Sequence, residues 1–334
     1  RRRLAAMSAQ KLFTIAADSQ FLPTLADRIL DGTLLAGWPR EGAFWLSDVT
    51  IVLPTRRARL SLAQAFLERG QVLLPDIRTF GGDDPEEEPF LPTASEPALP
   101  SAISPIERRL VLARLVAQWA QAPENRDSFP SSPNSAELFW LADSLGELLD
   151  DLEIAGVTRA ALRNVVVGDL AENWQRTLRF LDIVLQQWPQ VLAARGLADA
   201  ARNRNQRLRR QARSAPQIYG ERPVIAAGST GSIPATADLL GAIAALPRGA
   251  LVLPGLDSAM SEAEYGDLLS PEKLPHGHPQ YGLAQLLHGI GATPALATEL
   301  APGASPRVTL LRRAMALADD TADWGVAATA FADK

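Results

Sequence analysis

The chain has 334 residues, more than one hydrophobic core usually organises, so two or three packed units are expected. An apolar fraction of 47% with 21% charged residues is ordinary for a globular protein and excludes a chain that is disordered throughout. The net charge of -5 gives no overall attraction to nucleic acid. Any contact with DNA must therefore come from local clusters of arginine.

Cysteine is absent, which excludes disulfides, thiolate metal sites and cysteine nucleophiles and fits a reducing compartment. No apolar run approaches the roughly 18 residues that a membrane-spanning helix needs. The residues Arg1 to Arg3 are not followed by the apolar core of a signal peptide. We therefore expect a cytoplasmic protein that has no membrane partner.

Residues 1–80 alternate between short apolar runs and helical periodicity. A strand is predicted from Leu12 to Ile15, followed by a turn and by apolar positions at helical spacing from Phe21 to Leu30. A second strand, suited to burial on both faces, runs from Val49 to Leu53, and a helix follows from Arg56 to Glu68. Strands and helices in alternation predict an α/β fold with a parallel sheet.

Residues 81–104 combine an acidic run with several prolines and almost no periodicity, which predicts an exposed loop. A solvated charge run is favoured there over an acidic mimic of DNA that guards a basic channel. Residues 105–215 follow a helical pattern, and we expect a large α-helical insertion. Ser104 and Pro105 suit an N-cap and a first helical position. The expected helices run from Ile106 to Gln121, Ser135 to Ile154, Leu170 to Ala194 and Ala198 to Ala212.

The strand pattern returns in residues 216–257, which we expect to complete the α/β domain begun by residues 1–80. Residues 258–334 are expected to begin a following domain that the chain does not complete. They hold a loop-rich stretch, a helix from Tyr281 to Ile290 and a last helix that starts at Val308 and continues toward the C-terminus. The elements expected in 216–257 are a strand from Pro223 to Ala227, a glycine-rich turn, a helix from Pro234 to Leu246 and a strand from Ala250 to Leu253.

This order of elements is similar to that of the first half of a superfamily 1 helicase, and several stretches resemble one family in particular. They are Phe13-Thr14-Ile15, Val49 to Ala58 (VTIVLPTRRA), Ala227 to Thr236 (AGSTGSIPAT) and Leu251 to Asp257 (LVLPGLD). Over nearly its whole length the chain resembles the N-terminal, helicase-like part of the AddB proteins of alphaproteobacteria. These proteins belong to helicase-nuclease complexes that resect double-strand breaks for recombinational repair.

The resemblance implies a P-loop-NTPase-like α/β domain and a role as a scaffold segment that guides DNA. The DNA would be single-stranded or a duplex end, and the partner an AddA-type helicase-nuclease subunit in a heterodimer. The nuclease domain of AddB proteins lies near their C-terminus, outside this chain. We therefore expect DNA and a protein partner rather than a catalytic centre.

The nucleotide site that working helicases carry is degenerate in this sequence. Their first strand is followed by G-x-x-x-x-G-K-[ST], whose backbone N–H groups cradle the phosphates while the lysine reaches the β and γ oxygens. The loop here, Ala16 to Gln20, has neither glycine nor lysine, and it places Asp18 where anionic phosphates would sit. The acidic pair expected after the strand at Val224 to Ala226 is replaced by Ala227-Gly228. We therefore expect no ATP hydrolysis and no cofactor.

Two groups of residues are candidates for ligand contact. Thr55, Arg56 and Arg57 follow a strand and begin a helix, where open α/β sheets place ligand contacts, and the resemblance assigns this position to single-stranded DNA. Surface salt bridges are the alternative role for these arginines. A glycine-rich turn follows a later strand and could hold an anion or DNA, with Ser232 as a helix cap, or could serve close packing. It consists of Gly228, Ser229, Thr230, Gly231 and Ser232.

Three other features have simpler interpretations. The three histidines, His276, His278 and His288, lack the spacing of a zinc site, so we expect a surface loop and no metal. The arginines between Arg202 and Arg213 are scattered round their helix, which favours a solvated or partner-facing helix over a DNA groove. Four tryptophans in helical apolar patterns are expected to pack in cores. They are Trp119, Trp140, Trp174 and Trp188.

Two alternative functions remain open at this point. The first is a structural adaptor that docks the partner subunit without touching DNA. The second is a nucleotide-binding enzyme that uses Gly228 to Ser232.

Overall fold

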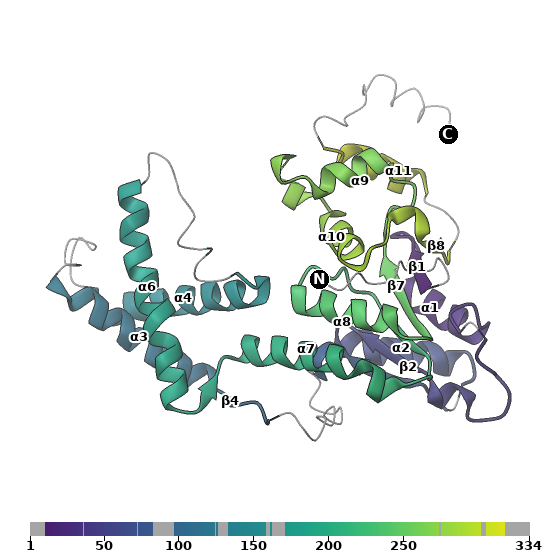
Figure 1. Cartoon of the computed structure of the whole chain (residues 1–334), viewed down its shortest axis with the longest axis horizontal. Coiled ribbons are helices and arrows are strands. Elements are labelled where there is room, and N and C mark those ends of the chain that lie inside the picture. Colours follow the sequence, from purple (N-terminus) through teal and green to yellow (C-terminus); the bar gives the residue numbers. More distant parts are fainter. Residues whose placement is uncertain are drawn as a thin grey trace. The chain divides into compact units, whose positions relative to one another are not determined.

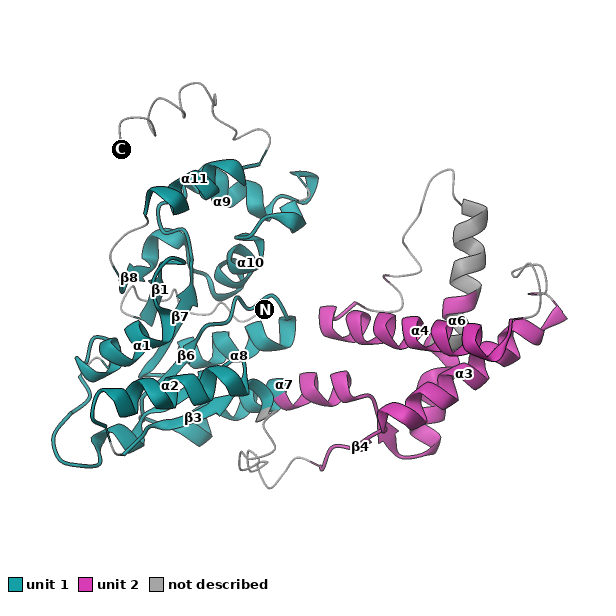
Figure 2. Ribbon diagram, turned by 180° about the vertical axis from the view of Figure 1, so that it is seen from behind, with its two compact units in different colours: residues 1–91, 208–334 teal, residues 92–207 magenta. Residues whose placement is uncertain are grey.

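The computed structural model describes residues 11–35, 37–71, 73–82, 97–123, 125, 133–157, 161, 171–273, 275–301 and 305–317. The chain forms two compact units (Figure 2). Unit 1 consists of residues 1–91 and 208–334, and unit 2 consists of residues 92–207. No helix in the described part of the chain has both the length and the apolar character that crossing a bilayer requires.

Unit 1 is built on a six-stranded sheet with the order β3-β2-β6-β7-β1-β8. Neighbouring strands are parallel in every pairing, so the predicted α/β fold with a parallel sheet is confirmed (Figure 1). The strands are β1 (Leu12–Ile15), β2 (Thr50–Leu53), β3 (Asp76–Thr79), β6 (Val224–Ala227), β7 (Gly249–Pro254) and β8 (Thr298–Glu299).

Helices cover both faces of this sheet. On one face, α1 (Phe21–Leu30) and α2 (Arg56–Glu68) pack on a core that includes Phe13. On the other face, α8 (Pro234–Ala245) and α10 (Tyr281–Ile290) pack on a core that includes Leu12. Because successive side chains of a strand point to opposite faces, a strand buried on both faces must be apolar throughout. This is why the central strands stand out in the sequence as short apolar runs.

The helix α7 (Ala200–Tyr219) is longer than the predicted Ala198 to Ala212 and includes Pro216. Its last part packs on the α8 face through Leu208 and Tyr219, both buried. Its polar buried residue Gln211 donates from Nε2 to the Tyr219 hydroxyl at 3.3 Å. The buried contacts of α7 therefore continue past Ala212, where the apolar pattern predicted that the helix ends.

Strand order changes direction between β1 and β7, which lie side by side. The chain leaves β1 through α1 toward β2, and it leaves β7 through α9 (Glu262–Leu269) and α10 toward β8, on the opposite face. In open α/β sheets a crevice forms at such a switch point, beyond the carboxyl ends of the strands. The switch point of unit 1 is therefore the place where the fold favours a ligand.

Several elements of unit 1 differ from the sequence predictions. The stretch after residue 258, expected to be loop-rich, contains α9, which Ser261 and Glu264 start with a reciprocal capping box. The last helix, α11 (Pro306–Ala314), was expected to start at Val308 and run on, but it ends at Ala314. The short 3₁₀ helices are η2 (Trp45–Asp48), η3 (Phe80–Gly82), η6 (Pro271–Lys273), η7 (Pro275–Gly277) and η8 (Pro294–Leu296).

Unit 2 is mainly helical, with α3 (Pro105–Gln121), α4 (Ser135–Ala155) and α6 (Ala171–Ala194). The predicted start of α3 is confirmed: the Ser104 hydroxyl accepts a hydrogen bond from Glu107 N at 3.2 Å, and Pro105 is the first helical residue. The core of this unit contains residues of all three helices. Among its fully or nearly fully buried side chains are Leu112, Val116, Trp119, Leu145 and Trp188.

The predicted loop at 81–104 is only partly described, because residues 83–96 lie outside the described part of the chain. The described remainder is not all loop. Ser101 and Ala102 form the strand β4 (Ser101–Ala102), which pairs in parallel with β5 (Leu197–Ala198), and Ile103 is buried. Two residues are too few to show a strand pattern, and this pairing joins segments far apart in sequence.

Candidate functional site

Three turns meet at the carboxyl edge of the sheet in unit 1, because β1, β2 and β6 are parallel and end at the same edge. A Cβ atom added at Gly228, which follows β6, would lie 3.4 Å from Phe21 Cε1 and 3.6 Å from Pro54 Cδ. Phe21 follows the turn after β1, and Pro54 follows β2 directly. The sheet thus brings both groups of candidate residues into one region.

The first group begins α2. Thr55 is the N-cap, and its hydroxyl accepts a hydrogen bond from Ala58 N at 3.1 Å. Arg56 and Arg57 follow as the first residues of the helix, and both are exposed. The first turn of α2 contains no acidic residue. Since the N-terminus of a helix carries partial positive charge, two arginines there produce a strongly positive point on the surface.

The glycine-rich turn of the second group packs against α10. Gly231 has a φ of 65°, and a Cβ atom there would lie 2.9 Å from a methyl carbon of Leu286. The Gly231 N–H donates to the Ser229 hydroxyl at 3.2 Å, so it is engaged within the turn. A Cβ atom added at Gly282, in the first turn of α10, would lie 3.3 Å from Ser232 Cβ. Glycine is therefore needed here for close packing between the turn and α10.

Ser232 does not cap α8, contrary to the sequence prediction. The N-cap is Ile233, which makes no side-chain capping bond, and Pro234 occupies the first helical position. Proline suits that position because its missing N–H would have had no partner in the helix. The Ser232 hydroxyl, one residue too early to cap, accepts from the Thr230 hydroxyl at 3.4 Å instead.

The loop after β1, where a working helicase would hold phosphates, is closed on itself. Ser19 N donates to Ala16 O at 3.0 Å, and Asp18 accepts from Ser305 N at 3.0 Å. Hydrogen bonds from the side chain and backbone of Ser305 lower the pKa of Asp18. On the other side, Gly255 N donates to Ile15 O at 2.8 Å. The loop is thus fixed by contacts to two distant segments.

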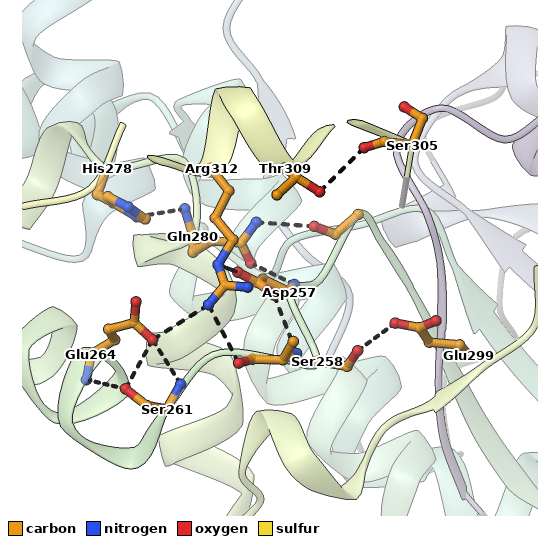
Figure 3. Close-up of polar contacts among 12 residues, drawn as sticks. Asp257, Ser258, Ser261, Glu264, His278, Gln280, Glu299, Ser305, Thr309 and Arg312 are labelled. Carbon is orange, nitrogen blue, oxygen red and sulfur yellow. Dashed lines mark hydrogen bonds and ion pairs between the residues drawn. The ribbon is translucent and has the colours of Figure 1, made fainter. Parts of the chain in front are cut away.

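A cavity of about 470 Å³ opens next to this loop, at the switch point between β1 and β7. The volume is in the range that small-molecule sites occupy. Its walls are mostly apolar, and most of its polar side chains come from the loop after β7, α9, α11 and the segments between them (Figure 3). The polar residues include Thr14, Asp257, Ser258, Glu264, His278, Gln280, Glu299, Thr309 and Arg312.

Arg312 is the centre of the polar network in this cavity. Its Nε lies 2.7 Å from Asp257 Oδ2, and its Nη2 lies 3.6 Å from Glu264 Oε2 (Figure 3). Hydrogen bonds from the backbone N–H and the hydroxyl of Ser261, together with Arg312, lower the pKa of Glu264. Gln280 fixes the loop after β7: its Nε2 donates to Gly255 O at 2.9 Å and its Oε1 accepts from Asp257 N at 3.2 Å.

The charges in the cavity do not suit a triphosphate. The cavity is lined by three carboxylates, of Asp257, Glu264 and Glu299, and by one guanidinium, and Glu299 accepts a hydrogen bond from the Ser258 hydroxyl. Carboxylates repel phosphate oxygens, and the low dielectric of a partly enclosed site strengthens that repulsion. The chemistry here is that of an internal ion-pair network. The sequence offered one signal for it, the Leu251 to Asp257 stretch at the end of a buried strand.

The three histidines lie in η7, in the turn before α10 and in the last turn of α10. In the described ranges, no group of three or more histidine, cysteine, aspartate or glutamate side chains could hold a metal ion. His278 lines the cavity, and its Nδ1 accepts a hydrogen bond from Gln280 N at 3.1 Å. The ring of His276 packs edge-on against Tyr281, with the centroids 4.9 Å apart.

The arginines of α7 are divided between the two units. Arg202 and Arg207 are exposed residues of unit 2, whereas Arg213 is an exposed residue of unit 1. Arg209 forms an ion pair with Asp238 of α8 at 3.6 Å. These arginines therefore do not belong to one surface of one unit.

The expectation that four tryptophans pack in cores is wrong for Trp140. Trp119 and Trp188 are buried, as expected, but the Trp140 side chain on α4 is 65% exposed. The side chain of Trp174 lies outside the described part of the chain. Apolar residues at helical spacing do not specify where the buried face ends, and Trp140 lies beyond that limit.

No protein-family model and no curated protein matches this chain.

Proposed function

We propose that this chain is a non-catalytic, helicase-like segment that guides DNA within a helicase-nuclease subunit similar to AddB. Its partner in that proposal is an AddA-type subunit, and the complex acts in double-strand break resection and recombinational repair. The parallel sheet of unit 1 would be a P-loop-NTPase-like domain with a degenerate nucleotide site, and the helical unit 2 would be its insertion. The support comes from the resemblance and from the geometry of the carboxyl edge.

The observation that carries the DNA contact is the position of Arg56 and Arg57. Both are exposed in the first turn of α2, at the carboxyl edge of the sheet. Two exposed cations at the positive end of a helix dipole make this point of the surface attractive to anions. A backbone phosphate of DNA is such an anion, and arginine binds it by charge-assisted hydrogen bonds.

The proposal that the nucleotide site is degenerate is supported by the turns after β1 and β6, the two strands on either side of β7. The turn after β1 places Asp18 at the edge, and the turn after β6 begins with Gly228 where an acidic pair would be needed. The neighbouring cavity adds the carboxylates described above. We expect no DNA-stimulated ATPase activity, and phosphate release above buffer background that is lost in Gly231→Ala would contradict this.

The DNA contact is tested by fluorescence anisotropy with a labelled single-stranded oligonucleotide and the whole chain. The variant Arg56→Ala/Arg57→Ala is expected to bind more weakly and to flatten the plot of log affinity against log salt. Each lost phosphate contact removes about one counterion release, so the slope should fall by roughly 0.7 per contact. Oligonucleotides of different sequence should lose affinity together, because phosphate contacts carry no sequence information.

Arg222→Ala is the matched control, because Arg222 is also exposed but precedes β6 and so lies at the opposite edge of the sheet. Its affinity and salt slope should stay those of the unmodified chain. If the well-folded double variant also keeps both values, the α2 turn is not on the DNA path. A collapse of its melting transition would instead assign Arg56 and Arg57 a structural role.

A structural adaptor is the second candidate function, and the exposure of Trp140 favours it. An adaptor would show no salt-sensitive DNA binding at all. The third candidate, an enzyme that binds nucleotide at Gly228 to Ser232, has less support because that turn packs against Leu286 and Gly282 of α10. Saturable ATP binding that persists in magnesium would favour the enzyme.

A further inference from the structure

The outer face of α4 in unit 2 carries an exposed tryptophan. Trp140 is 65% exposed, whereas Trp119 and Trp188 of the same unit are 6% and 1% exposed. Among the tryptophans whose side chains the structure describes, the others are buried or half-buried, and Trp140 alone is exposed. Trp is strongly enriched among the residues that dominate protein–protein binding energy, because its large apolar ring is buried when a partner binds.

Acidic residues continue this face along the helix. Taking Trp140 as the first position, Ser144, Glu147 and Asp151 follow at helical spacing, and all four are exposed. We call these four residues the α4 outer face. The helix has no basic residue at all. Its acidic residues are Glu137, Asp143, Asp150, Asp151, Glu147 and Glu153.

Three of the other acidic side chains of α4, those of Glu137, Asp143 and Asp150, have roles inside unit 2. Glu137 completes the capping box with Asn134 at the start of the helix. Asp143 forms an ion pair with Arg109 at 2.8 Å, and Asp150 forms one with Arg108 at 2.7 Å. These contacts account for acidic residues at those positions.

Among the described residues, Glu147 and Asp151 have no comparable partner. In the ranges that the structure describes, no ion pair reaches either carboxylate. They are four residues apart, so their like charges repel across one helical turn and weaken the helix slightly. A cationic group from another molecule would remove that repulsion, whereas nucleic acid would increase it.

We propose that the α4 outer face docks a protein partner whose surface has an apolar pocket flanked by arginine or lysine. Trp140 enters the pocket, and Glu147 and Asp151 pair with the basic residues beside it. Opposite charges across an interface fix its orientation and raise the association rate. This surface belongs to unit 2, and the inference does not depend on the DNA contact proposed for Arg56 and Arg57.

The test places the photo-cross-linking amino acid benzoylphenylalanine at position 140 of the full chain, in the cells from which the chain comes. Mass spectrometry of the cross-linked product identifies the partner segment. The expected product is one protein segment with lysine or arginine close to the cross-linked residue. Charge reversal by Glu147→Lys/Asp151→Lys should reduce its yield at least about tenfold, the effect of losing a central contact.

The control carries the same amino acid at Phe44, an aromatic residue of unit 1 that is 69% exposed. The chain with benzoylphenylalanine at position 44 should not yield the same product. The Trp140→Ala chain should keep its melting temperature, because the Trp140 side chain is mostly exposed. With the purified partner, Trp140→Ala should weaken binding at least about tenfold. Cross-linking to nucleic acid or to a second copy of the chain would overturn the proposal. So would the absence of any product, or a product whose yield survives the charge reversal.

Discussion

Arg312 Nε lies 2.7 Å from Asp257 Oδ2, and this ion pair joins α11 to the loop after β7. No residue of α11 is fully buried. Arg312 also donates from Nη2 to Ala259 O at 3.4 Å and approaches Glu264 Oε2 at 3.6 Å. A helix without buried apolar side chains has little packing energy, so polar contacts of one arginine become important for its position.

We predict that Arg312→Ala loosens α11 without destabilising unit 1 as a whole. The Arg312 side chain is 40% exposed, so loss of the pair should change the free energy of unfolding by less than about 1 kcal/mol. Amide hydrogen exchange in residues 310–314 should nevertheless accelerate several-fold, because local opening no longer breaks an ion pair. Arg307→Ala, an exposed change on the same helix, is the control. Equal exchange rates in both variants would mean that Arg312 does not hold the helix.

The second prediction concerns Gly231, in the turn that packs on α10. Its φ of 65° is unfavourable for any L side chain, and an added Cβ would approach Leu286 to 2.9 Å. Strain in the left-handed region costs about 1–2 kcal/mol, and overpacking adds about 1–3 kcal/mol. Gly231→Ala should therefore lower the free energy of unfolding by about 2–5 kcal/mol in a urea titration.

Gly70→Ala separates the two contributions to that cost. Gly70 has a φ of 78°, but no heavy atom lies within 4 Å of an added Cβ. This variant should show the backbone strain alone, about 1–2 kcal/mol. If Gly231→Ala is no worse than Gly70→Ala, then Leu286 moves aside and the turn does not need glycine for packing.

The central strands of the fold were predictable because both of their faces are buried. Thr50 to Leu53 is buried at every position, so its sequence is a continuous run of β-forming residues. The edge strand β3 was not predicted, because it has one neighbour and its sequence, Asp-Ile-Arg-Thr, contains two charged residues. The arginine and aspartate of β3 pair with each other at 2.7 Å at the solvent edge. Strand β8 has two residues and no pattern to detect.

The candidate site was predictable only where its residues are contiguous in sequence. Thr55 to Arg57 follow a recognisable strand, so their place at the carboxyl edge could be inferred. The cavity instead is lined by Ala16 and Ala17 of the loop after β1 and by Arg312 of α11. The hydrogen bond from Ser305 N to Asp18 joins the same two segments across 287 positions. Local periodicity holds no information about such pairs. The prediction that Trp140 is buried was wrong for a related reason, because helical spacing does not show where the buried face of a helix ends.

A third prediction follows from the ion pair between Arg108 and Asp199 in unit 2. The Arg108 Nε lies 3.0 Å from Asp199 Oδ1, outside hydrogen-bond geometry, and the two side chains are 18% and 15% exposed. Asp199 also accepts from Trp188 Nε1 at 2.8 Å. Asp199→Ala removes the acceptor for a buried indole and one partner of a mostly buried cation. We expect it to cost about 2–4 kcal/mol, measured by urea unfolding.

Asp143→Ala is the matched control, because Asp143 pairs with Arg109 at 2.8 Å but both side chains are about half exposed. Solvent screens such a pair, so the expected loss is below about 1 kcal/mol. Similar losses in the two variants would show that burial does not set the contribution of the Asp199 contacts.

Burial at the sheet surface raises the pKa of Tyr219 to about 12, mainly because desolvation disfavours the phenolate. The ordinary value is 10.0, so the folded protein retains the phenolic proton more strongly than the unfolded chain. Stability from this group is complete below pH 10, where both states are protonated. It is lost as the pH rises from 10 toward 12, because the unfolded state gives up its proton first.

The last prediction is that Tyr219→Phe removes part of the alkaline loss of stability. A shift of this size, from 10.0 to about 12, corresponds to a loss of about 1.4 kcal/mol at pH 11 relative to pH 8. Tyr219→Phe also removes the hydroxyl that accepts a hydrogen bond from Gln211 Nε2 at 3.3 Å. The loss of stability from this hydrogen bond is the same at every pH. The constant cost cancels when each protein is compared with itself at pH 8 and pH 11 by urea unfolding. Other groups titrate in this range in both proteins, so the difference between the two pH dependences isolates Tyr219.

Tyr265→Phe should have a smaller effect, since burial raises that pKa less. Parallel pH dependences for the Tyr219→Phe and unmodified proteins would mean that Tyr219 reaches solvent and ionises in the folded state.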